Sequence, residues 1–563
     1  MFSPADWTLE LEYDSQRILH PLGKMIRTDA FFVDASWNPI EGNTGVQFQL
    51  SLHPKQAFSL KKLRLLCSYP YADQQRIFCN GYQSWSDSGE YLATAGIPAL
   101  RRIARPFFKY YGDDWIPGIP RSKGLLHSWT YSYIRQQGQQ VLFIASLNES
   151  SCFTRIIHDT INRQLILELD IDQLQLTHSY PALEILLFSG NLPDAMNRWR
   201  NMMDFPARPR QHNWAWNSGD RFYQNTDLQT IIAEAHDCRE FLPEIKWFQM
   251  EDGYQKETGD WLKMKPEFQK KLGTLAQEIR KTGMEPGLWL APFVCSRKSD
   301  IFKQHPDWIL RDKKGKQIKA GYNSLWGGWY YALNIYHPGV REYLTGIFHV
   351  FTRQMGYKFL KLDFLFAAAI SPPSGKTRGQ VMQEGMEFLR LLAGPNVKLL
   401  ASGVPLASAF GQVDFCRIGP AVHLKWEHTL LAWLRKRERA STQNAVKTIL
   451  GRWMLNGQFF DNDPDVFLLR HEGNQLQETQ RSLLLLLNIL LGNIHFTSDN
   501  PGSYTPETRQ LLRDLKPLEN AKVTDIQNLG AEKYLIRYML EEDQNYKLEI
   551  DLKNAGYSIL ALH

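Results

Sequence analysis

The segment Tyr357–Phe366 reads YKFLKLDFLF, an apolar run in which a lysine and an aspartate stand two positions apart. Alternate residues of a β-strand point to the same face, so Lys361 and Asp363 are expected on one side of one strand. A carboxylate beside an ammonium stays ionised near neutrality, as a nucleophile requires. A buried structural ion pair is the other interpretation of the same two residues.

A pattern typical of strand, loop and helix in succession repeats on both sides of this segment. Most successive strands are about 35 to 45 residues apart, the span of one βα unit with its loop. Asp227–Phe241 and Leu272–Thr282 have helical periodicity, and the long interval after the third strand leaves room for an excursion over Pro306–Ile335. We therefore expect an eight-stranded (β/α)8 TIM barrel over residues 206–500. The expected strands end near Trp216, Glu251, Trp289, Leu362, Ser402, Arg417, Phe460 and Phe496.

The flanking segments have the shorter period of β-structure. Residues 1–205 contain alternating runs such as Gly45–Leu52, which predict an N-terminal antiparallel β-sandwich. Residues 501–563 contain the runs Lys533–Met539 and Tyr546–Ile550, which predict a small C-terminal antiparallel β domain. The motif NGYQSWS at Asn80–Ser86 has two interpretations, an aromatic plug over the sandwich or a loop that reaches a neighbouring site. The fold class is thus multidomain, with α/β and all-β parts.

The composition excludes several classes of protein. Apolar residues make up 43% and charged residues 22% of the 563, which excludes a fibrous or disordered chain. Lys and Arg exceed Asp and Glu by only 65 to 59, without long runs of one sign, so no nucleic-acid partner is implied. The basic stretch Leu310–Lys319 is best explained as a solvated loop or hairpin tip.

The sequence also bears on location and redox state. The first residues carry acids where a signal peptide needs a basic region, and the longest apolar stretch, Leu483–Leu491, is too short to span a bilayer. We therefore expect no membrane partner and a cytoplasmic location. The six cysteines lie far apart without a CxxC pair, so we expect reduced, buried thiols and no metal site. The oligomeric state stays open, and a homo-oligomer is compatible with the sequence.

Polar residues close several of the expected barrel strands, where a barrel places its active site. Glu251 and Asp252 follow the second strand and can accept hydrogen bonds from sugar hydroxyls, although a helix-capping role is the alternative. Trp289 closes the third strand with a flat face for stacking. Ser402, Gly403 and Arg417 add small residues and a cation to the same rim. Asp461, Asp463 and Asp465 lack the spacing of a calcium loop and are expected to form turns and contacts behind the site.

With these residues in view, the chain resembles the retaining α-galactosidases of glycoside hydrolase family 36, in clan D. The motifs that carry the resemblance are FQMEDGYQKETGDW, PGLWLAPF followed by SDIFKQHPDW, YKFLKLDFLF, and CRIGP followed by WEH. Together these motifs are specific for the family, whereas any one alone would be weak. The resemblance covers the whole architecture of sandwich, barrel and C-terminal β domain.

Transferred residue by residue, the resemblance makes Asp363 the catalytic nucleophile, which forms a glycosyl-enzyme intermediate. It places Asp252, Trp289, Lys361, Gly403 and Arg417 in the pocket around the sugar ring. It implies an α-linked oligosaccharide or glycoside as ligand, and no metal or organic cofactor, because two carboxyl groups suffice for this chemistry.

The sequence departs from the family pattern at three places. The residue after RIGP is Ala421, where the family has the aspartate that acts as general acid/base. Glu251 replaces the first member of a paired Asp-Asp. The first-strand motif reads WNSGD, so that Gly219 and Asp220 stand where the family has tryptophan and tyrosine. His423 and Glu427 lie near Ala421 in sequence and could substitute as proton donors.

Two functional hypotheses follow from this pattern. The first is an α-galactosidase-like retaining hydrolase that is impaired or altered in specificity, because an alanine cannot donate a proton. Ala421 would then be a catalytic residue replaced to trap substrate, or natural divergence toward a glycoside that is larger or cationic near Asp220. The second is a carbohydrate-binding pseudoenzyme, a lectin or sensor with little turnover.

Overall fold

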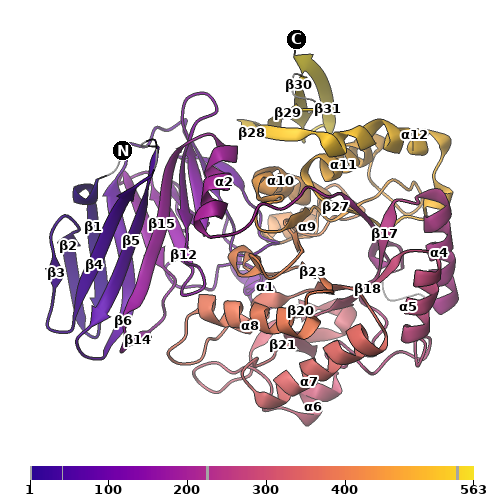
Figure 1. Ribbon diagram of the computed structural model, residues 1–563, viewed down its shortest axis with the longest axis horizontal. Helices are drawn as coiled ribbons and strands as arrows, with labels where there is room; N and C mark the ends of the chain where they lie inside the picture. Colours follow the sequence, from indigo (N-terminus) through magenta and orange to yellow (C-terminus); the bar gives the residue numbers. More distant parts are fainter. Residues whose placement is uncertain (1–2, 41, 43, 223–226, 541–543, 563) are drawn as a thin grey trace.

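The computed structural model describes residues 3–40, 42, 44–222, 227–540 and 544–562. Two antiparallel sheets come first along the chain, then a ring of parallel strands with helices around it, then a small antiparallel sheet. In Figure 1 the first two sheets lie on the left, the parallel ring lies to the right, and the last sheet lies at the top beside the C-terminus. The expected fold class, a sandwich followed by a TIM barrel and a C-terminal β domain, is confirmed.

The N-terminal part is a β-sandwich of two antiparallel sheets that share an apolar core. Alternation sets this arrangement, since β6 (Phe58–Ser68) buries every second side chain in most of its length. One sheet has the order β2 (Gln16–Pro21), β1 (Trp7–Tyr13), β6, β13 (Gln164–Leu169), β12 (Thr154–Asp159) and β9 (Leu125–Trp129), with β14 (Leu174–Leu176) also paired to β6. The other has the order β3 (Ile26–Arg27), β4 (Phe31–Pro39), β5 (Gly45–Pro54), β15 (Tyr180–Gly190), β11 (Val141–Ser146), β10 (Tyr131–Arg135), β7 (Arg76–Cys79) and β8 (Gly89–Leu92).

The central sheet is parallel throughout, as the repeat of strand, loop and helix predicts. Its strands end within about a residue of the expected positions at seven of the eight places. The strands are β16 (Asn213–Asn217), β17 (Ile245–Met250), β18 (Glu285–Leu290), β22 (Phe359–Leu362), β23 (Lys398–Ala401), β24 (Phe415–Arg417), β25 (Asp461–Asp463), β26 (Val466–Phe467) and β27 (Ile494–Thr497).

The seventh strand differs from the prediction. It was expected to end near Phe460, but it begins at Asp461 and is divided into β25, which pairs with β24, and β26, which pairs with β27. Pro464 lacks an N–H for the ladder and Asp465 has a φ of 74°, so the strand is interrupted there while the ring closes through one segment. A search for apolar runs misses this strand because its first half is the polar sequence DND.

Helices surround the ring, and the two predicted from periodicity are confirmed as α4 (Leu228–Phe241) and α5 (Leu272–Lys281). The side chain of Asp227 caps α4 by accepting a hydrogen bond of 3.0 Å from the backbone N–H of Thr230. The remaining helices of the ring include α7 (Pro338–His349), α8 (Arg378–Ala393), α10 (Thr442–Arg452) and α11 (Glu478–Leu491).

Two intervals between successive strands of the ring differ from the usual length, the one between β18 and β22 and the one between β23 and β24. The long one holds the expected excursion, a small antiparallel sheet of β19 (Val294–Ser296), β21 (Gly328–Ala332) and β20 (Lys319–Asn323). The short one, between β23 and β24, holds only the 3-10 turn Leu406–Ala409. At the C-terminus, α12 (Pro506–Leu515) leads into an antiparallel sheet of β28 (Lys522–Gly530), β29 (Lys533–Met539), β30 (Asn545–Asp551) and β31 (Gly556–Leu562).

The loop Asn80–Ser86 joins the sandwich to the ring, which favours the second interpretation of the NGYQSWS motif. Arg452, at the end of α10, is fully buried and its guanidinium points into this loop. Ser84 Oγ accepts a hydrogen bond of 2.9 Å from the backbone N–H of Gly403, and Trp85 Nε1 donates one of 2.8 Å to Ser402 Oγ. Arg452 donates to Oδ1 of Asn80 at 2.9 Å and to the carbonyls of Gly81 at 3.3 Å, Gln83 at 3.1 Å, Ser84 at 2.6 Å and Ile418 at 3.0 Å.

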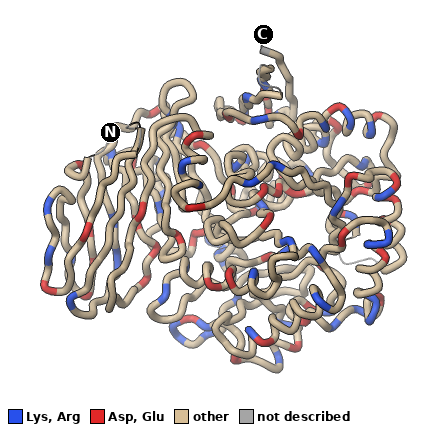
Figure 2. The backbone as a smooth tube through the Cα atoms, in the orientation of Figure 1, with Lys and Arg blue, Asp and Glu red and all other residues tan. Residues whose placement is uncertain are grey.

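The surface and the cysteines agree with the composition. Figure 2 shows Lys and Arg interspersed with Asp and Glu along the chain rather than gathered on one side of this view. In the basic stretch, Arg311 and Gln317 pair antiparallel, so it is a hairpin as expected. All six cysteines are buried and free of disulfides. Of the helices in the described ranges, none is both long and apolar enough to cross a membrane.

We predict that Arg452→Met weakens the junction between sandwich and ring. The change leaves several buried carbonyls without a donor, and each such group costs about 1–3 kcal/mol. The free energy of unfolding in urea should fall by roughly 3–5 kcal/mol, and limited proteolysis should cut within residues 80–88. Arg513→Met, at an exposed position of α12, is the control and should change neither measurement. Equal stability of both variants would contradict the role of Arg452.

Candidate functional site

A cavity of about 400 Å³ opens at the carboxyl ends of the barrel strands. Its size lies in the range of small-molecule sites. Nine of the ten site residues predicted from sequence line it, and Gly403 does not. The predicted residues in its wall are Gly219, Asp220, Glu251, Asp252, Trp289, Lys361, Asp363, Arg417 and Ala421.

Asp363 follows β22 directly and is held on several sides. Its backbone N–H donates to the carbonyl of Leu290 at 2.8 Å, which continues the pairing of β22 with β18. Trp289 Nε1 donates to Oδ2 at 3.1 Å, and the backbone N–H of Phe364 donates to Oδ1 at 3.1 Å. The carboxylate therefore faces the cavity in a fixed orientation, and Trp289, which is buried, acts on it through its N–H.

Phe364, the next residue, has a left-handed backbone with φ 56° and ψ 30°. A non-glycine residue in this conformation costs about 1–3 kcal/mol and persists where the surroundings impose it. Here the ring of Phe364 packs against Trp85 at 4.9 Å and against Trp326 at 4.8 Å between centroids. The turn thus ends the strand at Asp363 and adds an aromatic wall to the cavity.

Lys361 lies on the same side of β22 as Asp363, as predicted, but its ion pair is with another carboxylate. The ammonium donates to Oε1 of Glu251 rather than to Asp363. Burial opposes the charge on Lys361, but Glu251 and Asp363 nearby raise its pKa above the ordinary value. Burial likewise raises the pKa of Glu251, although Lys361 works in the opposite direction. The cation therefore stays charged and links strands two and four.

Asp252 is fixed by donors from two loops. Its Oδ2 accepts a hydrogen bond of 2.6 Å from Trp326 Nε1, and its Oδ1 accepts one from Gln255 Nε2. The next helix, α5, begins only at Leu272, so the helix-capping alternative for Glu251 and Asp252 is wrong. Both carboxylates line the cavity instead.

Arg417 closes β24 and pairs with two aspartates of the interrupted seventh strand. Its Nε lies 2.9 Å from Asp463 Oδ2, and one terminal nitrogen lies 2.6 Å from Asp465 Oδ1. Asp465 also accepts a hydrogen bond of 2.7 Å from the backbone N–H of Val422. The aspartates were expected in turns and contacts behind the site. Asp463 makes such a contact with Arg417, but Asp461–Asp463 are a strand and Asp465 lines the cavity itself.

Ala421 lines the cavity without a polar side chain, and its neighbours in sequence do not replace it. Glu427 is held by Arg439, whose nitrogens lie 3.0 Å and 2.7 Å from its oxygens, and the pKa of Glu427 is lowered although burial alone would raise it. Neither Glu427 nor His423 is among the residues that line the cavity. The idea that one of them supplies the proton is therefore not supported.

Gly219 and Asp220 occupy the rim after β16. A Cβ on Gly219 would lie 3.3 Å from Cγ of Glu251, so a larger residue would displace that side chain. Burial, together with the charge of Asp465, raises the pKa of Asp220 to about 7. Asp220 is thus a carboxyl group that holds its proton close to neutral pH.

The N-terminal domain contributes Trp85 and Tyr111 to the cavity wall. Gly403 explains how Trp85 reaches it, because a Cβ at this position, where φ is +63°, would lie 2.8 Å from Cζ2 of Trp85. Gly403 was expected in the pocket around the sugar ring, but it is not among the residues that line the cavity: its missing side chain makes room for an aromatic ring, and the neighbouring Ser402 lines the cavity instead.

Sequence reasoning missed the residues that loops bring in. Asn323 and Trp326 come from the excursion, and Leu431, Lys436 and Glu438 come from the segment between β24 and α10. For the excursion, the length of the interval was a signal that something covers the site. For Glu438, the sequence gives no distinguishing signal, because Glu427 is a carboxylate of the same segment and does not line the cavity.

One other cluster has metal-ligand chemistry, at the amino ends of β16 and β27. Ligand atoms of His212, His495 and Glu519 lie within 4.8 Å of one another. His212 Nδ1 and His495 Nε2 are 3.0 Å apart in a hydrogen bond, and Glu519 accepts one of 2.6 Å from Trp214. Burial lowers the pKa of both histidines. Hydrogen bonding between neutral rings accounts for this cluster.

Comparisons with known proteins agree with this geometry. The melibiase family model matches residues 206–384. The chain is 26% identical over 206 residues to an α-galactosidase of Escherichia coli and 22% identical over 191 residues to α-galactosidase 2 of Pediococcus pentosaceus. The matches cover 35% and 34% of this chain, but only 27% and 23% of those relatives, so the chain aligns with about a quarter of their length.

Solved structures match over more of the chain. The α-galactosidase TtGalA of Thermus thermophilus, in complex with p-nitrophenyl α-D-galactopyranoside, superimposes with a TM-score of 0.72 and 24% identity, covering 95% of this chain and all of that one. The complex of the same protein with stachyose superimposes with a TM-score of 0.70 and 25% identity, covering 88% of this chain and 99% of that one. The α-galactosidase AgaA of Geobacillus stearothermophilus, from family GH36, superimposes with a TM-score of 0.59 and 12% identity, covering 100% of this chain and 88% of that one. These relatives and neighbours are α-galactosidases, which are glycoside hydrolases, and the chain has their fold.

We predict a pH-dependent gain in stability for Asp220→Asn. Because the pKa of Asp220 is raised in the folded protein, the folded state holds a proton that the unfolded chain releases between about pH 4 and pH 7, so wild-type stability falls across this window. The amide resembles the protonated acid and does not titrate. The variant should therefore gain roughly 4 kcal/mol relative to wild type between pH 4 and pH 8, measured by urea unfolding at both values. A constant difference would contradict the raised pKa.

Proposed function

We propose that the chain is a retaining glycoside hydrolase that removes terminal α-linked galactose, or a related sugar, from oligosaccharides or glycosides. Asp363 is the nucleophile in this proposal. It attacks the anomeric carbon as the bond to the aglycone oxygen breaks, and a covalent glycosyl-enzyme intermediate forms. Water then cleaves the intermediate and releases Asp363 as a carboxylate.

The observation that carries this proposal is the placement of Asp363. Its carboxylate closes a barrel strand inside a sugar-sized cavity, and Trp289 Nε1 at 3.1 Å fixes its orientation. Fixed orientation lowers the entropy cost of attack, because the nucleophile does not need to be ordered in the transition state. Lys361 and Glu251 sit beside it as a hydrogen-bonded pair and offer donors and acceptors to hydroxyl groups.

The substrate class follows from the relatives and from the cavity. The Thermus protein was solved with an aryl α-galactoside and with stachyose, which supports an α-galactoside as ligand of this chain. Gly219, Asp220 and Glu251 stand in the cavity wall where the family pattern has other residues. We therefore propose that specificity differs from that of ordinary members, with weaker binding of simple galactosides or a preference for a related sugar.

A second candidate function is a carbohydrate-binding pseudoenzyme, and Ala421 favours it. The alanine lies in the cavity wall at the position where the family pattern has its proton donor. Loss of general acid catalysis costs about 10²- to 10⁴-fold in rate, which would leave a lectin or sensor. This candidate predicts ligand binding without any covalent intermediate.

The six buried thiols bear on location. Reduced cysteines that pair with nothing are usual in a reducing compartment. We propose a cytoplasmic protein on this ground.

We predict that incubation with a 2-fluoro α-galactosyl fluoride adds the mass of one fluorogalactosyl group to the protein, and that Asp363→Asn abolishes the addition. The amide keeps the shape of the side chain and loses the charge of the nucleophile. Intact-protein mass spectrometry and peptide mapping provide the measurement. Asp300→Asn, on a half-exposed helix away from the cavity, is the control and should label like wild type.

The outcomes separate the two functions. A label on Asp363 supports the hydrolase. Binding of galactosides by calorimetry with no label in any variant supports the pseudoenzyme. A label that persists in Asp363→Asn, or that maps to another residue, contradicts the assignment of the nucleophile.

A further inference from the structure

Six carboxylates line the cavity, and four of them already have partners or a role. Glu251 pairs with Lys361, Asp465 pairs with Arg417, and Asp252 accepts N–H donors from Trp326 and Gln255. Asp363 is the nucleophile of the proposed function. The remaining two, Asp220 and Glu438, have no Lys or Arg within ion-pair distance among residues 3–222 and 227–562 that the structure describes.

We propose that Glu438 is the general acid/base of this site and takes the place that Ala421 leaves empty. The inference rests on the proposed glycoside hydrolysis by Asp363. Glu438 belongs to the same segment between β24 and α10 as Ala421, and both residues line the cavity together with Asp363. Two residues of one loop, Ala421 and Glu438, thus line the same cavity.

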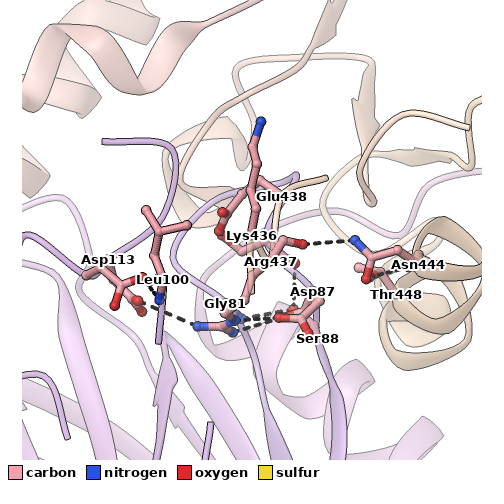
Figure 3. Close-up of polar contacts among 12 residues, drawn as sticks. Gly81, Asp87, Ser88, Leu100, Asp113, Lys436, Arg437, Glu438, Asn444 and Thr448 are labelled. Carbon is pink, nitrogen blue, oxygen red and sulfur yellow. Dashed lines mark hydrogen bonds and ion pairs between the residues drawn. The ribbon is translucent and has the colours of Figure 1, made fainter. Parts of the chain in front are cut away.

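The loop presents Glu438 to the cavity by anchoring its neighbour elsewhere. In Figure 3, the side chains of Lys436 and Glu438 extend to one side of the loop, and the guanidinium of Arg437 points to the other, toward Asp87 and Asp113. Arg437 pairs with Asp87 and lies 3.5 Å from Asp113, both in the N-terminal domain. The backbone carbonyl of Arg437 accepts a hydrogen bond of 2.9 Å from Asn444 Nδ2 in α10.

The carboxyl group itself has a fitted place. Ser86 Oγ donates to Oε1 of Glu438 at 2.8 Å. A Cβ on Gly112 would lie 2.6 Å from the same oxygen, so any other residue at 112 would push the carboxyl group away. Lys436 makes no ion pair with it among the described residues: the ammonium lies over the rings of Phe108 at 4.1 Å and Tyr111 at 4.4 Å, although the charge of Glu438 still raises the pKa of Lys436 that burial lowers.

The protonation state suits a general acid. Burial raises the pKa of Glu438 to about 7, although Arg437 lowers it, and the hydrogen bond from Ser86 lowers it further. The charged groups that face it are Lys436, Arg437 and Arg439 of its own loop and Asp87 and Asp113 of the N-terminal domain. Near neutral pH the side chain can therefore both give and accept a proton, as the two steps require.

The two steps balance as follows. In the first, Asp363 bonds to the anomeric carbon, the bond to the aglycone oxygen breaks, and that oxygen takes the proton of Glu438. In the second, the Glu438 carboxylate removes a proton from water, whose oxygen bonds to the anomeric carbon while the bond to Asp363 breaks. Both residues return to their starting states.

Asp220 is the competing candidate in the same cavity, and its place argues against it. It follows the first strand rather than the segment that carries Ala421 and Glu438, and the charges that act on it are those of Asp465, Arg470, Glu251 and Lys361. Burial raises the pKa of Tyr111, and the charges of Asp363 and Glu438 raise it further, so both carboxylates lie near its hydroxyl group. A proton donor must lie close to the nucleophile's reaction centre, across the scissile bond.

The test compares Glu438→Gln with wild type on galactosides that share the sugar and differ in leaving group. Turnover of stachyose should fall by about 10²- to 10⁴-fold, whereas bond cleavage of a dinitrophenyl galactoside, which needs no protonation, should change little. The glycosyl-enzyme should accumulate, and azide should restore turnover with α-galactosyl azide as product, because azide attacks without a base. The alkaline limb of the wild-type pH profile near pH 7 should disappear.

Three further variants sharpen the comparison. Glu427→Gln is the matched control in the same loop. The ratio of its rate to the wild-type rate should be the same for good and poor leaving groups. Ala421→Asp should add little to the wild type but should restore at least part of the activity of Glu438→Gln. Glu438→Asp keeps a carboxylic acid on a side chain one methylene shorter. It should retain a reduced activity and should rank the substrates by rate as wild type does. This variant keeps the test informative if the glutamine variant misfolds.

Each outcome is decisive. Unchanged kinetics in Glu438→Gln, or the same leaving-group dependence in Asp220→Asn instead, overturns the assignment while the labelling of Asp363 still supports the hydrolase. A wild type that forms no covalent intermediate and turns over no galactoside overturns the proposed function and this inference together.

Discussion

The guanidinium of Arg452 holds the loop Asn80–Ser86 against the barrel, and the site depends on that loop. Arg452 is fully buried, yet it makes no ion pair among the described residues and donates instead to backbone carbonyls and one asparagine. Such carbonyls would be costly to bury without donors, so the loop has one low-energy position. From this position Trp85 reaches the cavity and Ser86 reaches Glu438. The two domains therefore share one active-site wall instead of touching only at their surfaces.

Charge pairing decides which carboxylates remain reactive. Lys361 and Arg417 each pair with carboxylates from other strands, so that one ion pair links strands two and four and the others link strands six and seven. An unpaired buried carboxylate cannot stay charged cheaply, so its pKa rises until it holds a proton near neutral pH. Asp220 and Glu438 are in this state. The ion pairs of the barrel thus leave two carboxyl groups with a raised pKa in a site that also contains a fixed carboxylate at Asp363.

The sequence was sufficient for the barrel and for most of the residues on its strand ends, because both follow from local patterns. Alternation along Phe359–Leu362 put Lys361 and Asp363 on one side, and parallel strands then brought Glu251, Trp289 and Arg417 to the same rim. It was not sufficient for contacts that depend on distant segments. Lys361 pairs with Glu251 instead of Asp363, and Gly403 leaves space for the ring of Trp85. The strand Asp461–Asp463 is polar, so a search for apolar runs does not find it. Glu438 was missed because no local pattern distinguishes it from a solvated loop residue.

A proton donor on a loop has different physical requirements from one at a strand end. A residue at position 421 is oriented by β24, whose pairing with β23 and β25 fixes its backbone. Glu438 lies far along a segment with only the short helix α9 (Thr429–Trp433), so side-chain contacts must set its position, one from Asn444 of α10 and the others from the N-terminal domain. Asp87 and Asp113 supply the ion pairs for Arg437, Ser86 supplies the hydrogen bond, and Gly112 supplies the space. The N-terminal sandwich would then act as part of the catalytic apparatus, since removing any of these contacts frees the acid without touching the barrel.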